Sequence, residues 1–66
     1  MTISADQATA YVLDTLQRDQ SPFKIIGKPE QATIDGVAVI RVSISDGEFT
    51  TIFDCWNTES GIYGEY

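Results

Sequence analysis

Residues 37–56 read VAVIRVSISDGEFTTIFDCW, and this stretch decides the fold. Two runs with apolar residues at alternating positions flank Asp46-Gly47, and side chains alternate between the two faces of a strand. Asp-Gly tolerates the positive φ angles of a two-residue turn, so the stretch predicts a β-hairpin. In that register Ile44 faces Phe49 and Ile40 faces Phe53.

The two faces of the expected hairpin differ in composition. One face is mainly apolar and is the expected core face; it carries Ala38, Ile40, Val42, Ile44, Phe49, Thr51, Phe53 and Cys55. The opposite face mixes polar and apolar residues, namely Val37, Val39, Arg41, Ser43, Thr50, Ile52, Asp54 and Trp56. A sheet face that contacts only water is expected to be polar, so the mixed face is a candidate binding surface.

The segment before the hairpin predicts a helix from Ser4 to about Asp19. Ser4 and Gln7 have the spacing of a capping box, in which each residue satisfies a backbone N–H group of the other. Apolar residues follow at helical spacing and form one stripe, made of Ala5, Ala8, Val12, Leu13 and Leu16. The helix must end before Pro22, because the residue that precedes a proline disfavours helical geometry.

Residues 23–34 predict an irregular first strand. Gly27 and Pro29 interrupt its alternation, which indicates a bulge on an edge strand. Gly27-Lys28-Pro29 is not expected to bind phosphate, because one glycine and one lysine do not form the nest of backbone donors that such loops use.

Asp35-Gly36 marks the turn between this strand and the hairpin. A two-residue loop there puts Gln31 and Thr33 on the core face. We expect a three-residue loop with a glycine bulge instead, because it re-aims the apolar residues Ala32 and Ile34.

The last ten residues predict a loop over residues 57–61 and a short closing strand over residues 62–66. The expected register pairs Trp56 with Tyr63 and Asp54 with Glu65. It directs three residues to the core, namely Ile62, Gly64 and Tyr66. Because every connection is short, neighbouring strands pair antiparallel. We therefore predict an α+β fold, with one N-terminal helix packed on a four-stranded antiparallel meander.

Length and composition set limits on function. The 66 residues predict one small domain over residues 1–66, with a formal net charge of −6. Net negative charge argues against direct binding of nucleic acid and is compatible with a basic protein partner. One cysteine forms no internal disulfide, and no signal peptide or membrane-spanning run is evident, so we expect a cytoplasmic protein that binds no membrane.

Catalytic and metal sites are not expected. Asp54, Glu59 and Glu65 can gather near the last hairpin, but nothing in the sequence places them in a cleft that would separate their pKa values. Cys55 falls on the core face, and the chain has no histidine to activate it. We predict no catalytic residue, no cofactor, no metal ligand and no enzymatic activity.

The function expected is that of a small adaptor or inhibitor that binds another protein through the open face of its sheet. Aromatic and apolar residues at the centre of such a face are typical interaction hot spots. The predicted binding residues are Val39, Arg41, Ile52, Asp54, Trp56, Glu59 and Tyr63. Two alternatives remain open: a homodimer formed through the same face, and an acidic mimic of nucleic acid that inhibits a nucleic-acid-binding protein, such as a phage-encoded anti-defence inhibitor.

Overall fold

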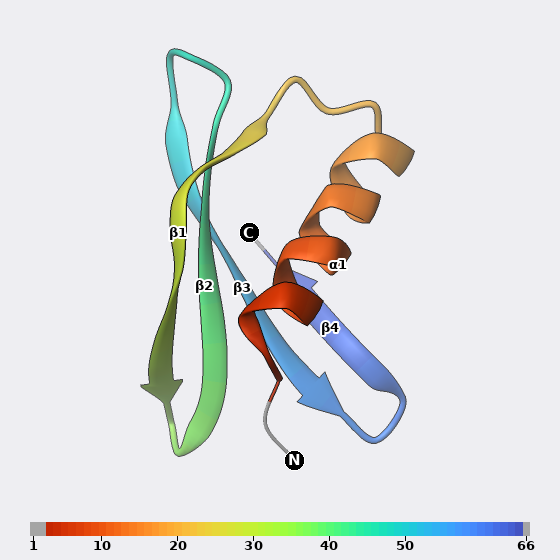
Figure 1. Ribbon diagram of the computed structural model, residues 1–66, viewed down its shortest axis with the longest axis vertical. Coiled ribbons are helices and arrows are strands. Elements are labelled where there is room, and N and C mark those ends of the chain that lie inside the picture. Colours follow the sequence, from red (N-terminus) through yellow and green to blue (C-terminus); the bar gives the residue numbers. More distant parts are fainter. Residues whose placement is uncertain (1–2, 66) are drawn as a thin grey trace.

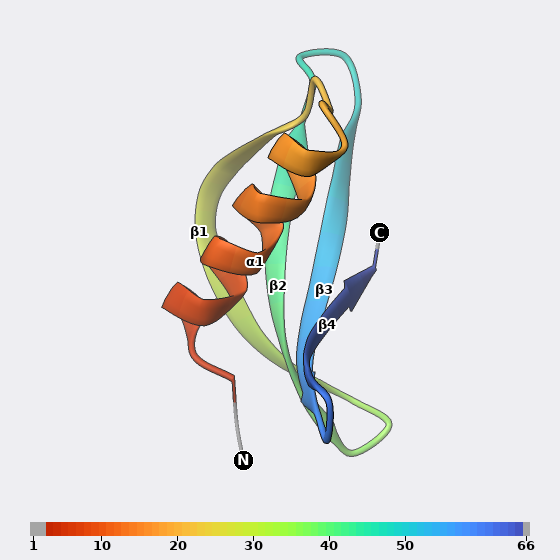
Figure 2. The ribbon, with the colours of Figure 1, turned by 90° about the vertical axis from the view of Figure 1, so that its right-hand side faces the viewer.

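The computed structural model describes residues 3–65 and confirms the α+β architecture. Helix α1 (Ala5–Arg18) is followed by the four strands β1 (Lys24–Ile34), β2 (Val37–Ser45), β3 (Thr50–Thr58) and β4 (Gly61–Glu65). The strands form one antiparallel sheet in the order β1-β2-β3-β4, which is the predicted meander. α1 lies diagonally across one face of the twisted sheet (Figures 1 and 2).

The start of α1 is the predicted capping box. The Ser4 hydroxyl accepts the backbone N–H of Gln7 at 3.1 Å, and the Gln7 side chain accepts that of Ser4 at 3.0 Å. The predicted stripe is right at its centre but wrong at one edge, because Leu13 is 46% exposed and Thr15 is buried in its place. At about 100° per residue, Thr15 lies roughly 60° around the helix from Val12 at the centre of the stripe, and Leu13 lies roughly 100° from it.

The end of α1 is a Schellman motif with an unusual residue. The backbone N–H of Ser21 donates to the carbonyl of Leu16 at 2.9 Å, and that of Gln20 donates to the carbonyl of Gln17 at 3.1 Å. Gln20 takes the left-handed conformation, with φ of 52°. Glycine is usual at this position, because a Cβ atom is strained in the left-handed region.

Gln20→Gly is therefore expected to stabilise the protein by about 0.5–1 kcal/mol. Gln17→Gly is the matched control, because it lies inside α1 and should cost about 1 kcal/mol. Urea unfolding followed by circular dichroism measures both. Destabilisation by both substitutions would contradict the strain assigned to Gln20.

The β2–β3 hairpin has a longer loop than predicted. Its ladder pairs Ser45 with Thr50 and Val42 with Phe53, so the connection has four residues rather than two. The Asp46 carboxylate accepts the backbone N–H groups of Glu48 at 2.9 Å and Phe49 at 2.8 Å, which closes this loop. These hydrogen bonds hold the pKa of Asp46 below its usual value.

Because the register shifts by two residues, each side chain that stays in a strand keeps its predicted face. Phe49 is the exception: it lies in the loop and is 67% exposed, so its assignment to the core was wrong. Ala38 is also exposed, close to the end of β2.

β1 is the bulged edge strand that the sequence predicts. Its pairing with β2 shifts between Ile26 and Glu30, at Gly27-Lys28-Pro29. The expected three-residue turn after β1 is wrong, because Ile34 pairs directly with Val37 across Asp35-Gly36. Both turn residues have positive φ, 51° and 79°, as a type I′ turn requires.

β4 pairs with β3 in the predicted register. Trp56 lies opposite Tyr63 and Asp54 lies opposite Glu65, and the ladder continues by one further pair to Thr58 and Gly61. Tyr66, predicted to point to the core, lies outside the described residues.

The core lies between α1 and the sheet. Its buried residues are Ile3, Ala8, Val12, Leu16, Ile40, Val42, Ile44, Phe53 and Cys55. The rings of Tyr11 and Phe53 meet edge to face, with centroids 6.1 Å apart. Gly64 lies against this pair: a Cβ atom there would come within 2.5 Å of Phe53 and 2.9 Å of Tyr11. The absence of a side chain at Gly64 therefore lets β4 approach the helix side of the core.

Gly64→Ala is expected to destabilise the protein by roughly 1–3 kcal/mol through overpacking against Phe53. Phe53→Leu in the same chain should recover part of that loss, because the smaller side chain leaves room for the added methyl group. Thermal unfolding of the two single variants and the double variant measures this coupling. Strictly additive effects would show that the contact with Phe53 is not the cause.

Candidate protein-binding face

The face of the sheet that points away from α1 carries the candidate site. Ile40, Val42, Phe53 and Cys55 are buried towards the helix, so their neighbours along each strand point to the opposite side. The central residues of this outer face are Ile26, Glu30, Ala32, Ile34, Val37, Val39, Arg41, Ser43, Ile52, Asp54, Trp56, Tyr63 and Glu65. Within residues 3–65, no helix or strand covers it.

One row of the outer face is charged across all four strands. Strand pairing brings Glu30 opposite Arg41, Arg41 opposite Asp54, and Asp54 opposite Glu65. Arg41 donates from Nε to Asp54 Oδ1 at 3.0 Å. Among residues 3–65, Arg41 forms its ion pair with Asp54. It forms no ion pair with Glu30, its neighbour on β1, or with Glu65. We call these four residues the charged row.

The next row along the strands is apolar. Ala32 pairs with Val39, and Trp56 pairs with Tyr63, whose ring meets the indole at a centroid distance of 5.1 Å and an angle of 66°. Trp56 is half-buried, and Val39 is buried, with 4% of its surface exposed. Val39 therefore offers almost no surface to a partner, whereas Trp56 and Tyr63 do.

Large apolar side chains remain exposed on both sides of the charged row. The exposed fractions lie between 39% and 49% for five residues of the outer face, namely Ile26, Ile34, Val37, Ile52 and Tyr63. They come from all four strands, and the charged row divides them into two groups: Ile26 and Ile52 on one side, and Ile34, Val37 and Tyr63 on the other.

The structure brings six of the seven predicted binding residues onto one face. Arg41 and Asp54 form its ion pair, Trp56 and Tyr63 its aromatic pair, and Val39 and Ile52 lie in the rows beside them. Glu59 is apart from them: it lies at the tip of the β3–β4 turn, beyond the last pair of that ladder.

The sequence interpretation missed part of the face. Ile34 belongs to it because the turn at Asp35-Gly36 has two residues, and the positive φ preference of that dipeptide was the available signal. Ile26 and Glu30 flank the bulge in β1, whose size decides their faces and is not fixed by the sequence pattern.

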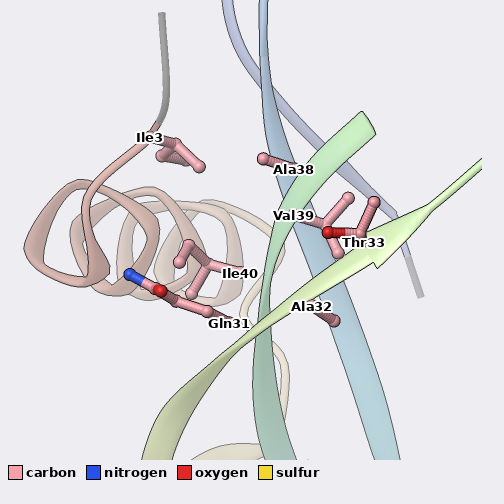
Figure 3. A pocket seen from close by; sticks show the side chains of 7 residues that line it. All are labelled: Ile3, Gln31, Ala32, Thr33, Ala38, Val39 and Ile40. Atoms are coloured by element: carbon pink, nitrogen blue, oxygen red, sulfur yellow. The ribbon is translucent and has the colours of Figure 1, made fainter. Parts of the chain in front are cut away.

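Two hollows among residues 3–65 include no residue of the charged row, although the first borders the outer face at Ala32 and Val39. The first, of about 290 Å³, lies where Ile3 meets the end of the β1–β2 hairpin; Ile40 and Gln31 point to its helix side (Figure 3). The second is an apolar groove of about 460 Å³ between the end of α1 and the start of β1, lined mainly by Leu13, Leu16, Phe23 and Ile25. Lys24 lines the second hollow, and no ionisable residue among residues 3–65 lines the first.

Cys55 is buried beneath the sheet, and its thiol contacts no hollow described above. Burial, with a smaller effect from the charge of Asp54, raises the pKa of Cys55 to about 11. Residues 3–65 contain no group of three or more carboxylate or cysteine side chains placed to hold a metal ion.

The chain matches no protein-family model, and no curated protein or solved structure is significantly similar to it. In the part of the chain that the structure describes, α1 is too short and too polar to cross a membrane.

The thiol of Cys55 is expected to react with Ellman's reagent at least about a hundredfold more slowly in the native protein than in denaturant, because it is buried and protonated. Its raised pKa also predicts that stability falls as the pH rises from about 9 to about 11, since the unfolded chain loses this proton first. The Cys55→Ala variant should not show the part of the fall in stability between about pH 9 and about pH 11 that ionisation of this thiol causes. Rapid modification of the native protein would contradict this description.

Proposed function

We propose that this chain is a non-enzymatic protein-binding module, an adaptor or an inhibitor, that docks a partner protein through the outer face. The observation that carries the proposal is the uncovered sheet face itself. Five of its large apolar side chains are between 39% and 49% exposed, and one of them, Tyr63, packs edge to face on Trp56. Large apolar side chains that are exposed together on one face in this way are a recognised sign of an interaction site.

The energetics favour a centre of binding at Trp56 and Tyr63. Covering a half-exposed isoleucine or valine contributes roughly 1 kcal/mol, so the exposed aliphatic residues together supply only a few kcal/mol. Association costs roughly 4–15 kcal/mol in lost freedom of motion, so strong contacts elsewhere are needed. Tryptophan and tyrosine supply them, because they give large contact area at low entropic cost.

Charge complements this apolar centre. The chain has a formal charge of −6, which attracts a basic partner over distances of about a Debye length. Arg41 and Asp54 then orient the partner, since charged groups at an interface mainly set encounter rate and register.

Trp56→Ser is expected to weaken partner binding by at least about thirtyfold, as hot-spot substitutions do. The measurement is capture of partners from a lysate of the source cells, with bound proteins identified by mass spectrometry. Phe49→Ser is the matched control, because Phe49 is a 67% exposed aromatic residue in the β2–β3 loop, away from the outer face. Ile52→Ser is a second test that leaves the Trp56–Tyr63 pair intact.

Circular dichroism establishes that each variant is folded. A partner that Trp56→Ser retains, but that moderate salt releases, would contradict docking and favour the mimicry of nucleic acid by the acidic surface. Loss of the partner from Phe49→Ser, with retention by Trp56→Ser and Ile52→Ser, would place the interface at the hairpin loop instead.

A further inference from the structure

We propose that the outer face binds a partner segment in which one arginine or lysine lies between apolar residues, with the cation seated on the charged row. This inference rests on the proposed function and adds the chemistry of the partner to it.

The charged row has more anions than cations. Glu30, Asp54 and Glu65 contribute three carboxylates, and Arg41 contributes the one guanidinium, which leaves a formal charge of −2. Asp54 and Glu65 lie directly opposite each other on β3 and β4, and like charges in this arrangement repel.

Neither lysine of β1 forms an ion pair with the charged row among residues 3–65. Lys24 pairs with Ser45, four residues along β2 from Arg41, which is about 13 Å away and beyond a Debye length of about 8 Å. Lys28 lies in the β1 bulge and makes no ion pair among residues 3–65.

A docking partner has to respond to this charge, because docking removes water from the row. A purely apolar partner would leave Glu65 and Glu30 without hydrogen-bond donors, and burial of unpaired carboxylates is costly. An arginine or lysine supplies those donors and relieves the repulsion between Asp54 and Glu65. In the free protein, water solvates the excess carboxylates of the charged row. When a partner displaces that water, only a partner with a cation can replace the lost interactions.

The rows beside the charged row fit the rest of such a side chain. On one side lie Trp56 and Tyr63, and on the other lies Ile52, each two residues along its strand from the charged row. That spacing is roughly 7 Å, so the aliphatic stem of a lysine or arginine can pack on either neighbour while its charged end reaches the carboxylates.

A second copy of this chain is the less suitable occupant. Pairing two outer faces would bring two rows of formal charge −2 together, on two molecules of net charge −6 each. Like charges across an interface are a recognised means of excluding a partner.

The test uses displayed random peptides rather than an unknown ligand. Peptides are selected on the wild-type protein and counter-selected on Trp56→Ser and Ile52→Ser. We expect the peptides that depend on the outer face to contain one arginine or lysine flanked by apolar residues. The affinity of synthetic versions is then measured through the fluorescence of Trp56, the one tryptophan in the chain.

Glu65→Gln should weaken binding of such a peptide by about five- to tenfold. Glu48→Gln is the control with the same change in net charge, because Glu48 lies in the β2–β3 loop. It should change the affinity less than twofold. Replacing the peptide's arginine with the neutral isostere citrulline should weaken binding to the wild type and have little effect on binding to Glu65→Gln.

The outcomes separate the two proposals. Peptides that depend on Trp56 but lack a basic residue, or that bind Glu65→Gln and Glu48→Gln equally, would overturn the cationic partner and leave docking intact. Selection of no peptide that depends on the outer face would contradict docking itself. A wild-type dimer in sedimentation equilibrium that Ile52→Ser dissociates would overturn the cationic partner in favour of a second copy.

Discussion

The packing of one helix against one face of the sheet is the constraint on which the rest of the structure depends. α1 has 14 residues and the sheet has four strands. An amphipathic helix buries one stripe, and a sheet needs a layer on each face to bury both. All the buried contacts between layers therefore form on the helix side, around Val12 and Phe53. β4 packs closely against this side at Gly64. Because the one helix covers only this side of the sheet, the outer face stays uncovered among residues 3–65.

The sequence predicted most of this arrangement, because alternation is a robust signal. The register of the β2–β3 hairpin was wrong by two residues, yet the core residues Ile40, Val42 and Phe53 lie on the predicted face. A shift by two residues returns each side chain to the same side of a strand, whereas a shift by one would have reversed them all. The order of elements was predicted for the same reason, since it depends on pattern rather than on exact pairing.

Loops and edges could not be predicted in the same way. The length of the β2–β3 loop depends on hydrogen bonds from two backbone N–H groups to the Asp46 carboxylate, a local preference that competes with the two-residue turn. Leu13 was wrongly placed because the width of the buried stripe depends on where the helix crosses the sheet. The candidate face was nevertheless identified by its composition, since Trp56, Ile52 and Arg41 alternate with core residues regardless of loop length.

The charged row has two effects on the outer face: it opposes self-association, and under the proposed docking it favours a cationic partner. An uncovered sheet face with exposed isoleucines would favour self-association, and the net negative charge of the charged row across its centre opposes it. If docking occurs as proposed, the same carboxylates lose water only when a partner supplies a cation, so solubility and selectivity arise from one set of residues. Arg41 has a distinct part in this arrangement, because its contact with Asp54 fixes one carboxylate in place. Glu30 and Glu65 at the two edges of the sheet are then left without an ion pair among residues 3–65, and the preference for a cationic partner depends on these two residues.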